Sequence, residues 1–170
     1  NTGELGTKVE RSQAPSLEVT PIVVDGTMYV STPLGRVFAI DPATGKARWR
    51  FDAKVDINAG YGDFTSRGVS AWRDPRAADG SPCRRRIYVA TIDARLIALD
   101  AANGTPCRDF GSGGTVDLRR GLRISPFEFP AYQQTSPPVV MGDVILFGSS
   151  IADKSRATPA GGEVLALDTL

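Results

Sequence analysis

The stretch Ala39-Ile40-Asp41-Pro42-Ala43-Thr44-Gly45-Lys46-Ala47-Arg48-Trp49 decides the fold of this chain. It is typical of a strand end, a tight turn and the start of the next strand. Asp41 can accept hydrogen bonds from main-chain amides in the turn, and Gly45 can adopt a positive φ without steric cost. Trp49 then offers a large flat surface for packing on a neighbouring unit. The stretch therefore predicts a β-hairpin that ends in a docking aromatic.

The same pattern returns twice along the chain. A second copy runs from Ala98 to Gly104, with Arg108 where the tryptophan would fall, and a third begins at Ala166. The aspartates of the three copies are about 60 to 70 residues apart, which is long for a propeller repeat, so each copy should carry insertions. The repeat is the strongest indication of fold in the sequence.

Strand and turn signals divide each copy into short strands. The first copy predicts strands at 20–24, 28–31, 36–41 and 46–51. The second starts at 66, carries an insertion at about 73–84, resumes at 86–91 and 95–100, and has an irregular fourth strand that ends near 110. The third predicts strands at 136–141, 144–149 and 163–168.

Four short antiparallel strands from consecutive sequence form one propeller blade. The sequence therefore predicts an all-β fold, a partial β-propeller of about two and a half blades at about 20–51, 66–110 and 136–170. An isolated arc of blades would leave strand edges and blade faces uncovered. We therefore expect the 170 residues to be a fragment of a larger domain.

Composition and charge exclude several classes of function. The formal net charge of +1 gives no footprint for nucleic acid, and the basic run Arg84-Arg85-Arg86 is best interpreted as a solvated strand start. No apolar segment approaches the length of a membrane span, and no signal peptide is visible. The absence of histidine excludes a Cys/His zinc site at Cys83 and Cys107. A disulfide and two buried thiols both remain open.

Strand alternation places the long connections 52–65, 111–134 and 150–162 on one face of the propeller. Long loops gathered on one face favour a binding face, although loops merely tolerated there are the alternative. The face carries hydroxyls, amides, one arginine and carboxylates. Such groups could bind a polyanionic ligand and a hard cation. The residues concerned are Asp63, Thr65, Ser66, Arg67, Gln133, Gln134, Thr135, Ser136, Ser149, Ser150 and Asp153.

Several runs resemble a known family. The Ala-x-Asp-x-x-x-Gly-x-x-x-Trp pattern of 39–49 is similar to the tryptophan-docking motif of eight-bladed quinoprotein propellers. Thr65-Ser66-Arg67-Gly68-Val69, the run from Asp93 to Ala101 and Thr135-Ser136-Pro137-Pro138 add to the likeness. Together they resemble a pyrroloquinoline quinone (PQQ)-dependent dehydrogenase of the membrane-bound glucose dehydrogenase branch. The resemblance also implies that Cys83 and Cys107 form a disulfide.

The resemblance implies a set of cofactor contacts. Arg67 matches the arginine that contacts the carboxylate and quinone edge of PQQ, a role that suits a planar donor. Thr135, or Ser136 beside it, matches a hydroxyl that lies against PQQ, and Ser150, Ile151 and Ala152 match the segment that lines it. Asp153 matches the acidic ligand of a Ca²⁺ or Mg²⁺ ion. The catalytic aspartate of the family belongs to a later blade, so none of the present residues is expected to be catalytic.

Three positions bear on the branch of the family. Asp63 stands where the glucose dehydrogenases carry histidine, which weakens a sugar assignment, and the adjacent Cys-Cys pair of the alcohol and methanol dehydrogenases is absent. Trp72 is a possible stacking surface, but a core aromatic is the better interpretation.

The resemblance implies a periplasmic enzyme that oxidises a sugar or alcohol hydroxyl and passes electrons to a membrane quinone or a cytochrome. The alternative is a non-catalytic propeller scaffold of the bacterial envelope that binds other proteins through its loops.

Overall fold

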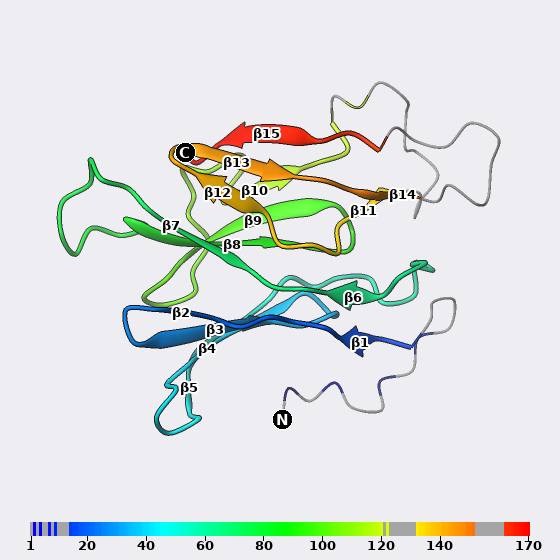
Figure 1. Cartoon of the computed structure of the whole chain (residues 1–170), viewed down its shortest axis with the longest axis horizontal. Helices are drawn as coiled ribbons and strands as arrows, with labels where there is room; N and C mark the ends of the chain where they lie inside the picture. The colour runs from blue at the N-terminus through cyan, green and yellow to red at the C-terminus, as the bar shows by residue number, and fades with distance from the viewer. Residues whose placement is uncertain are drawn as a thin grey trace.

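The computed structural model describes residues 2, 4, 7, 9, 14–120, 122, 132–151 and 162–170. These residues form β-strands and no helix, so none of the described segments could cross a membrane as a helix. The predicted all-β fold is confirmed. Figure 1 shows the larger sheets lying one beside the next in chain order.

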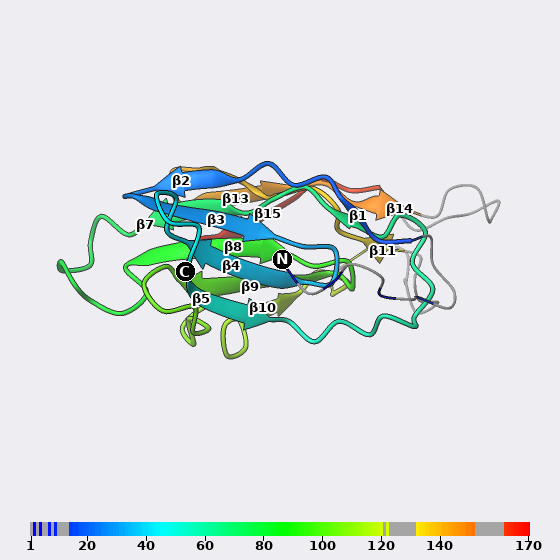
Figure 2. The same cartoon turned by 90° about the horizontal axis from the view of Figure 1, so that it is seen from below.

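The first sheet contains β2 (Ile22–Val24), β3 (Thr27–Ser31), β4 (Arg36–Ile40) and β5 (Ala47–Asp52). The four strands pair antiparallel in chain order, as the turn signals predict. Figure 2 shows the four strands side by side, in order from β2 to β5. Alternate residues of β3 are buried, which is typical of a sheet with one face against a neighbour.

The second sheet contains β7 (Ser70–Arg73), β8 (Arg85–Ala90), β9 (Arg95–Asp100) and β10 (Thr115–Asp117), again antiparallel in chain order. The prediction that the fourth strand ends near Phe110 is wrong. After β9 the chain makes turns that hydrogen-bond back onto β9, where the amide of Cys107 donates to the carbonyl of Ala98 at 2.8 Å. The regular edge strand therefore forms only at β10.

The third sheet contains β12 (Val139–Met141), β13 (Val144–Phe147) and β15 (Leu165–Asp168), with β13 in the centre. Two short pairs complete the described strands. β1 (Ser16–Leu17) lies parallel to β6 (Thr65–Ser66), and β11 (Tyr132–Gln133) lies antiparallel to β14 (Ser150–Ile151). Both pairs lie at the right-hand end of the molecule in Figure 1.

Apolar side chains fill the two spaces between neighbouring sheets. A cluster that contains Val37, Ile87 and Leu99 joins the first sheet to the second, and these side chains are wholly buried. A second cluster, which contains Leu96 and Ile145, joins the second sheet to the third. Burial of such side chains is the dominant force that holds the sheets together.

Trp49 on β5 docks on the turn that follows β9 in the second sheet. Its indole Nε1 donates a hydrogen bond to the carbonyl of Ala101 at 3.0 Å, and the Tyr29 hydroxyl donates to the same carbonyl at 3.0 Å. A Cβ on Gly104 would lie 2.5 Å from the Trp49 ring, and Gly104 has a φ of +76°. The turn therefore needs glycine both for its backbone and for the approach of the ring. The docking role predicted for Trp49 is confirmed.

The shared geometry of the two described turns comes from their aspartates. Asp41 Oδ1 accepts hydrogen bonds from the amides of Ala43 and Thr44 at 2.9 and 3.1 Å. Asp100 Oδ1 accepts from the amide of Ala102 at 2.7 Å, while its Oδ2 accepts from the amide of Cys83 at 2.6 Å. Asp100 therefore shapes its own turn and also holds the segment before β8.

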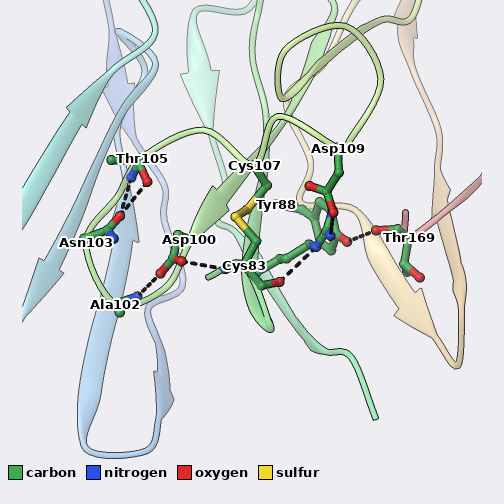
Figure 3. The surroundings of a disulfide bond; sticks show 10 residues. Cys83, Tyr88, Asp100, Ala102, Asn103, Thr105, Cys107, Asp109 and Thr169 are labelled. Atoms are coloured by element: carbon green, nitrogen blue, oxygen red, sulfur yellow. Dashed lines mark hydrogen bonds and ion pairs between the residues drawn. A yellow bond between two sulfur atoms is a disulfide. The ribbon is translucent and has the colours of Figure 1, made fainter. Parts of the chain in front are cut away.

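Cys83 and Cys107 form a disulfide, with their Cα atoms 5.7 Å apart (Figure 3). This pairing is the one that the resemblance implied. It ties the segment before β8 to the turns after β9, close to the aspartate contact just described. The two loops that leave the second sheet at this end are therefore joined covalently.

The solvated strand start expected at Arg84-Arg85-Arg86 is wrong for Arg86, whose side chain is 2% exposed. The Arg86 guanidinium pairs with Asp109, and its central carbon lies 5.7 Å from the ring centroid of Trp72. Trp72 itself is buried in the core, as the preferred interpretation predicted. A buried guanidinium is tolerated here because a carboxylate and an aromatic face both stabilise it.

Candidate cofactor-binding face

Main-chain hydrogen bonds join the three sheets in series at the end of the strands where β1 and β6 lie. The amide of Thr20 donates to the carbonyl of Arg67 at 3.0 Å, and the amide of Arg67 donates to the carbonyl of Thr135 at 2.9 Å. Residues from three repeats are therefore brought to one place. Arg67 and Thr135, predicted separately from the sequence, are direct neighbours.

Two carboxylates hold the Arg67 side chain. Its Nη2 lies 2.9 Å from Glu18 Oε2 and 3.2 Å from Asp63 Oδ2. The guanidinium is 38% exposed, so it remains accessible from solvent. Both ion pairs involve Nη2, and a guanidinium carries further donors at Nε and Nη1.

Glu18 was not predicted as a functional residue, because the sequence indicates only a polar loop before Thr20. The parallel pairing of β1 with β6 brings it to Arg67, with Ser16 opposite Thr65 and Leu17 opposite Ser66. Pairing between such short, distant segments leaves no periodicity in the sequence. The one signal in the sequence was the position of Glu18, an acidic residue just before the first strand of a repeat.

Two hydroxyls of the predicted face are engaged by the protein itself. Thr65 Oγ1 donates to the carbonyl of Ser16 at 2.9 Å, and Ser66 Oγ lies 2.8 Å from Ser31 Oγ with a shared hydrogen bond. Both side chains are buried. They therefore support the segment that carries Arg67.

The remaining predicted hydroxyls lie on neighbouring segments. Thr135 is buried and Ser136 is exposed, directly after β11. Ser150 is half-buried on β14, opposite Gln133 in the strand register. The structure thus brings Arg67 and Thr135 together and places Ser150 on the strand that pairs with β11. Ala152 and Asp153 lie outside the described residues.

A group of buried polar side chains lies beside these hydroxyls. Among the described residues, both amide atoms of Gln134, the hydroxyl of Tyr132 and the hydroxyl of Ser149 are buried without a hydrogen-bond partner. Burial raises the pKa of Tyr132 above its usual value, and contacts with Ser149 and Gln134 that do not meet hydrogen-bond geometry oppose this shift. Buried polar groups without partners are costly, and they are a feature of sites that a ligand completes.

The one group of potential metal ligands found among the described residues is not a metal site. Cys83, Cys107 and Asp109 lie within reach of one another, but the two sulfur atoms are joined in the disulfide. A disulfide offers no thiolate to a metal ion. The group also lies away from Arg67, in the loops shown in Figure 3.

The stacked antiparallel sheets and their tryptophan docking define a partial β-propeller. A family model, the beta-propeller domain of PQQ glucose/ethanol/alcohol dehydrogenases, matches residues 1–170. The chain belongs to this family.

Relatives and solved structures agree with the family. The chain is 38% identical to quinoprotein glucose dehydrogenase of Gluconobacter oxydans, over 89% of this chain and 19% of the relative. It is 36% identical to quinate/shikimate dehydrogenase (quinone) of Acinetobacter baylyi, over 90% of this chain and 20% of that protein. The crystal structure of quinohemoprotein alcohol dehydrogenase from Comamonas testosteroni superposes with a TM-score of 0.68 at 31% identity, covering 91% of this chain and 19% of that one. The chain thus spans about a fifth of the length of the proteins it matches.

The described donors fit the cofactor of the family. PQQ is a planar molecule with several carboxylates, and the partly exposed guanidinium of Arg67 can bind a carboxylate through charge-assisted hydrogen bonds. The main chain of Thr135 is hydrogen-bonded to that of Arg67. The unpartnered amide of Gln134, one residue before Thr135, is a further donor and acceptor on the same segment.

Proposed function

We propose that these sheets are consecutive blades of a PQQ-dependent dehydrogenase and form part of its cofactor-binding face. The blades would lie at about 20–51, 66–117 and 136–170 of an eight-bladed ring. The supporting observation is the 2.9 Å main-chain hydrogen bond from Arg67 to Thr135, which brings two predicted cofactor contacts together. The proposal extends to the whole protein, of which this chain supplies one part of the ring.

In this proposal each residue of the face has a distinct task. Arg67 binds a carboxylate of PQQ, while Glu18 and Asp63 hold its guanidinium in place. Hydroxyls of Thr135, Ser136 and Ser150 donate to the oxygens of the cofactor. Buried Thr65 and Ser66 keep the segment rigid, so that little ordering entropy is lost when the cofactor binds.

PQQ, when bound, supplies a quinone that accepts the hydride removed from the substrate carbon. Ala152 would line the cofactor, and Asp153 would ligate a Ca²⁺ or Mg²⁺ ion beside it. We assign no catalytic residue within this chain.

The substrate class that we propose is a sugar or alcohol hydroxyl, and the acceptor is a membrane quinone or a cytochrome. A periplasmic location follows from this proposal. The names of the relatives span glucose, quinate/shikimate, glycerol and alcohol dehydrogenases, which supports a hydroxyl-bearing substrate without selecting one.

Dye reduction by the full-length protein tests this function. The protein is reconstituted with PQQ and Ca²⁺ or Mg²⁺ and assayed with a panel of aldoses, polyols and alcohols. Substrate-dependent reduction that requires PQQ is expected. No reduction with any substrate, and no PQQ binding with either cation, would leave the propeller as a scaffold for protein contacts.

A further inference from the structure

A cavity of about 390 Å³ lies between the first and second sheets, at the end of the strands away from β1 and β6. β3, β5 and β7 line it, together with the segment before β8 and the turn after β9. Its lining residues include Arg48, Arg73, Arg84, Arg85, Trp49 and Asp100. The volume is within the range of small-molecule sites.

Four arginines line this cavity, and the carboxylates that pair with them lie outside its lining. Arg48 lies 3.2 Å from Asp41, and Arg85 pairs with Asp25. Asp79 is shared by Arg73 and Arg84 and is 85% exposed. Three carboxylates, of which Asp25 and Asp79 are exposed and Asp41 is half-buried, therefore pair with four arginines.

Asp100 is the one carboxylate among the lining residues, and its oxygens are directed at main-chain amides. They accept from Ala102 and Cys83 at 2.7 and 2.6 Å, as Figure 3 shows. The charge of Asp100 is thus stabilised by the backbone. The lining residues thus comprise four arginines and one carboxylate, and each arginine is paired with a carboxylate outside the lining.

The walls of the cavity are held in place before any ligand arrives. The Cys83–Cys107 disulfide and the Asp100–Cys83 hydrogen bond fix the segment that carries Arg84 and Arg85. Trp49 and Tyr29 form an apolar side that is anchored on the carbonyl of Ala101. A preformed site loses little entropy on binding.

We propose that this cavity binds a compact polyanion that carries two or more phosphate or carboxylate groups. Exposed ion pairs such as those with Asp79 contribute little stability, so an incoming anion can replace them. Arginine binds phosphate and carboxylate through paired, charge-assisted hydrogen bonds, and several arginines can act on one ligand. This site goes beyond the proposed dehydrogenase function. Its lining includes Arg73, where β7 ends, whereas Arg67 and Thr135 lie before the starts of β7 and β12.

Isothermal titration of the full-length protein with inorganic diphosphate and, separately, with citrate tests the proposal. Saturable binding of at least one anion is expected, and the stronger of the two tells whether phosphate or carboxylate is preferred. Arg73→Gln and Arg85→Gln should each weaken that binding about tenfold. Melting temperatures of the variants show that each remains folded.

Two matched variants keep the test specific. Arg119→Gln removes an arginine that is also paired with an acid but lies outside the cavity, and Arg67→Gln removes the one on the cofactor-binding face. Both should bind the anion as the unmodified protein does. Absence of saturable binding with both anions would overturn the proposal. The proposal would also be overturned if Arg119→Gln weakened anion binding as much as the cavity variants do. It would be overturned as well if only Arg67→Gln reduced anion binding.

Discussion

The amide of Arg67 donates a hydrogen bond to the carbonyl of Thr135, with nitrogen and oxygen 2.9 Å apart. Because this bond is made by the main chain, it survives replacement of either side chain. The bond fixes the two main-chain positions and involves neither the guanidinium nor the hydroxyl. Side-chain substitutions here therefore test binding with little disturbance of the fold.

Thr135→Val should lower the affinity for PQQ about fivefold to tenfold and leave the unfolding midpoint nearly unchanged. The substitution keeps the shape of the side chain and removes one hydroxyl donor, which is worth about 1 kcal/mol. Fluorescence titration of the full-length protein with PQQ gives the affinity. Thr135→Ser, which keeps the hydroxyl, is the control and should bind like the unmodified protein.

Gly104→Ala should destabilise the protein by about 2–4 kcal/mol. The new Cβ would lie 2.5 Å from the Trp49 ring at a φ of +76°, so strain and overpacking add. Gly45→Ala is the matched control, because Gly45 has a φ of +70° with no atom within 4 Å of an added Cβ. It should cost about 1 kcal/mol. Equal losses in urea unfolding would contradict the docking role of Trp49.

Trp49→Phe and Tyr29→Phe should each cost about 1 kcal/mol, and the double variant should cost more than their sum. Each single variant leaves one donor on the Ala101 carbonyl, whereas the double variant leaves this buried oxygen without a partner from these side chains. A double-mutant cycle measured by chemical denaturation gives the coupling. Strict additivity would show that the shared carbonyl is not the energetic link.

Removal of the disulfide by Cys83→Ala together with Cys107→Ala should destabilise the protein by about 3 kcal/mol, because the bond closes a loop of 24 residues in sequence separation. Reductant should lower the unfolding midpoint of the unmodified protein and leave the double variant unaffected. If reductant also lowered the unfolding midpoint of the double variant, the effect of reductant would not come from this disulfide.

The carboxylate of Asp117 contributes stability that is lost in acid. Hydrogen bonds from the Arg119 side chain hold the pKa of Asp117 below its usual value, with Nε 2.8 Å and Nη2 2.9 Å from the carboxylate oxygens. The contribution is complete above the unfolded pKa and disappears as the pH falls through the lower, folded pKa. Asp117→Asn should therefore reduce the fall in stability between pH 5 and about pH 2. A carboxyl signal that titrates at its usual pKa in NMR spectra would contradict this.

Local patterns in the sequence identified much of the fold. The Asp-to-Gly turns at 41–45 and 100–104 have the predicted aspartate hydrogen bonds, since an aspartate, a glycine and their spacing define such a turn by themselves. Docking of Trp49 follows from the same run of residues.

The sequence did not predict the features that depend on contacts between distant segments. The fourth strand of the second sheet lies at Thr115–Asp117 because turns first bond back onto β9. Arg86 is buried because Trp72 and Asp109 approach it from other segments. Glu18 reaches Arg67 through a two-residue parallel pairing. None of these contacts produces a periodic pattern in the sequence from which it could be predicted.

The dissociation constant of PQQ for the full-length protein, measured in the presence of Ca²⁺ for Arg67→Ala and Arg119→Ala, tests the central claim most directly. Both arginines are 38% exposed and paired with acids, but only Arg67 lies on the proposed face. We expect Arg67→Ala to weaken PQQ binding at least tenfold, and Arg119→Ala to leave it unchanged. Equal affinities for the two variants and the unmodified protein would contradict a cofactor-binding role for this face.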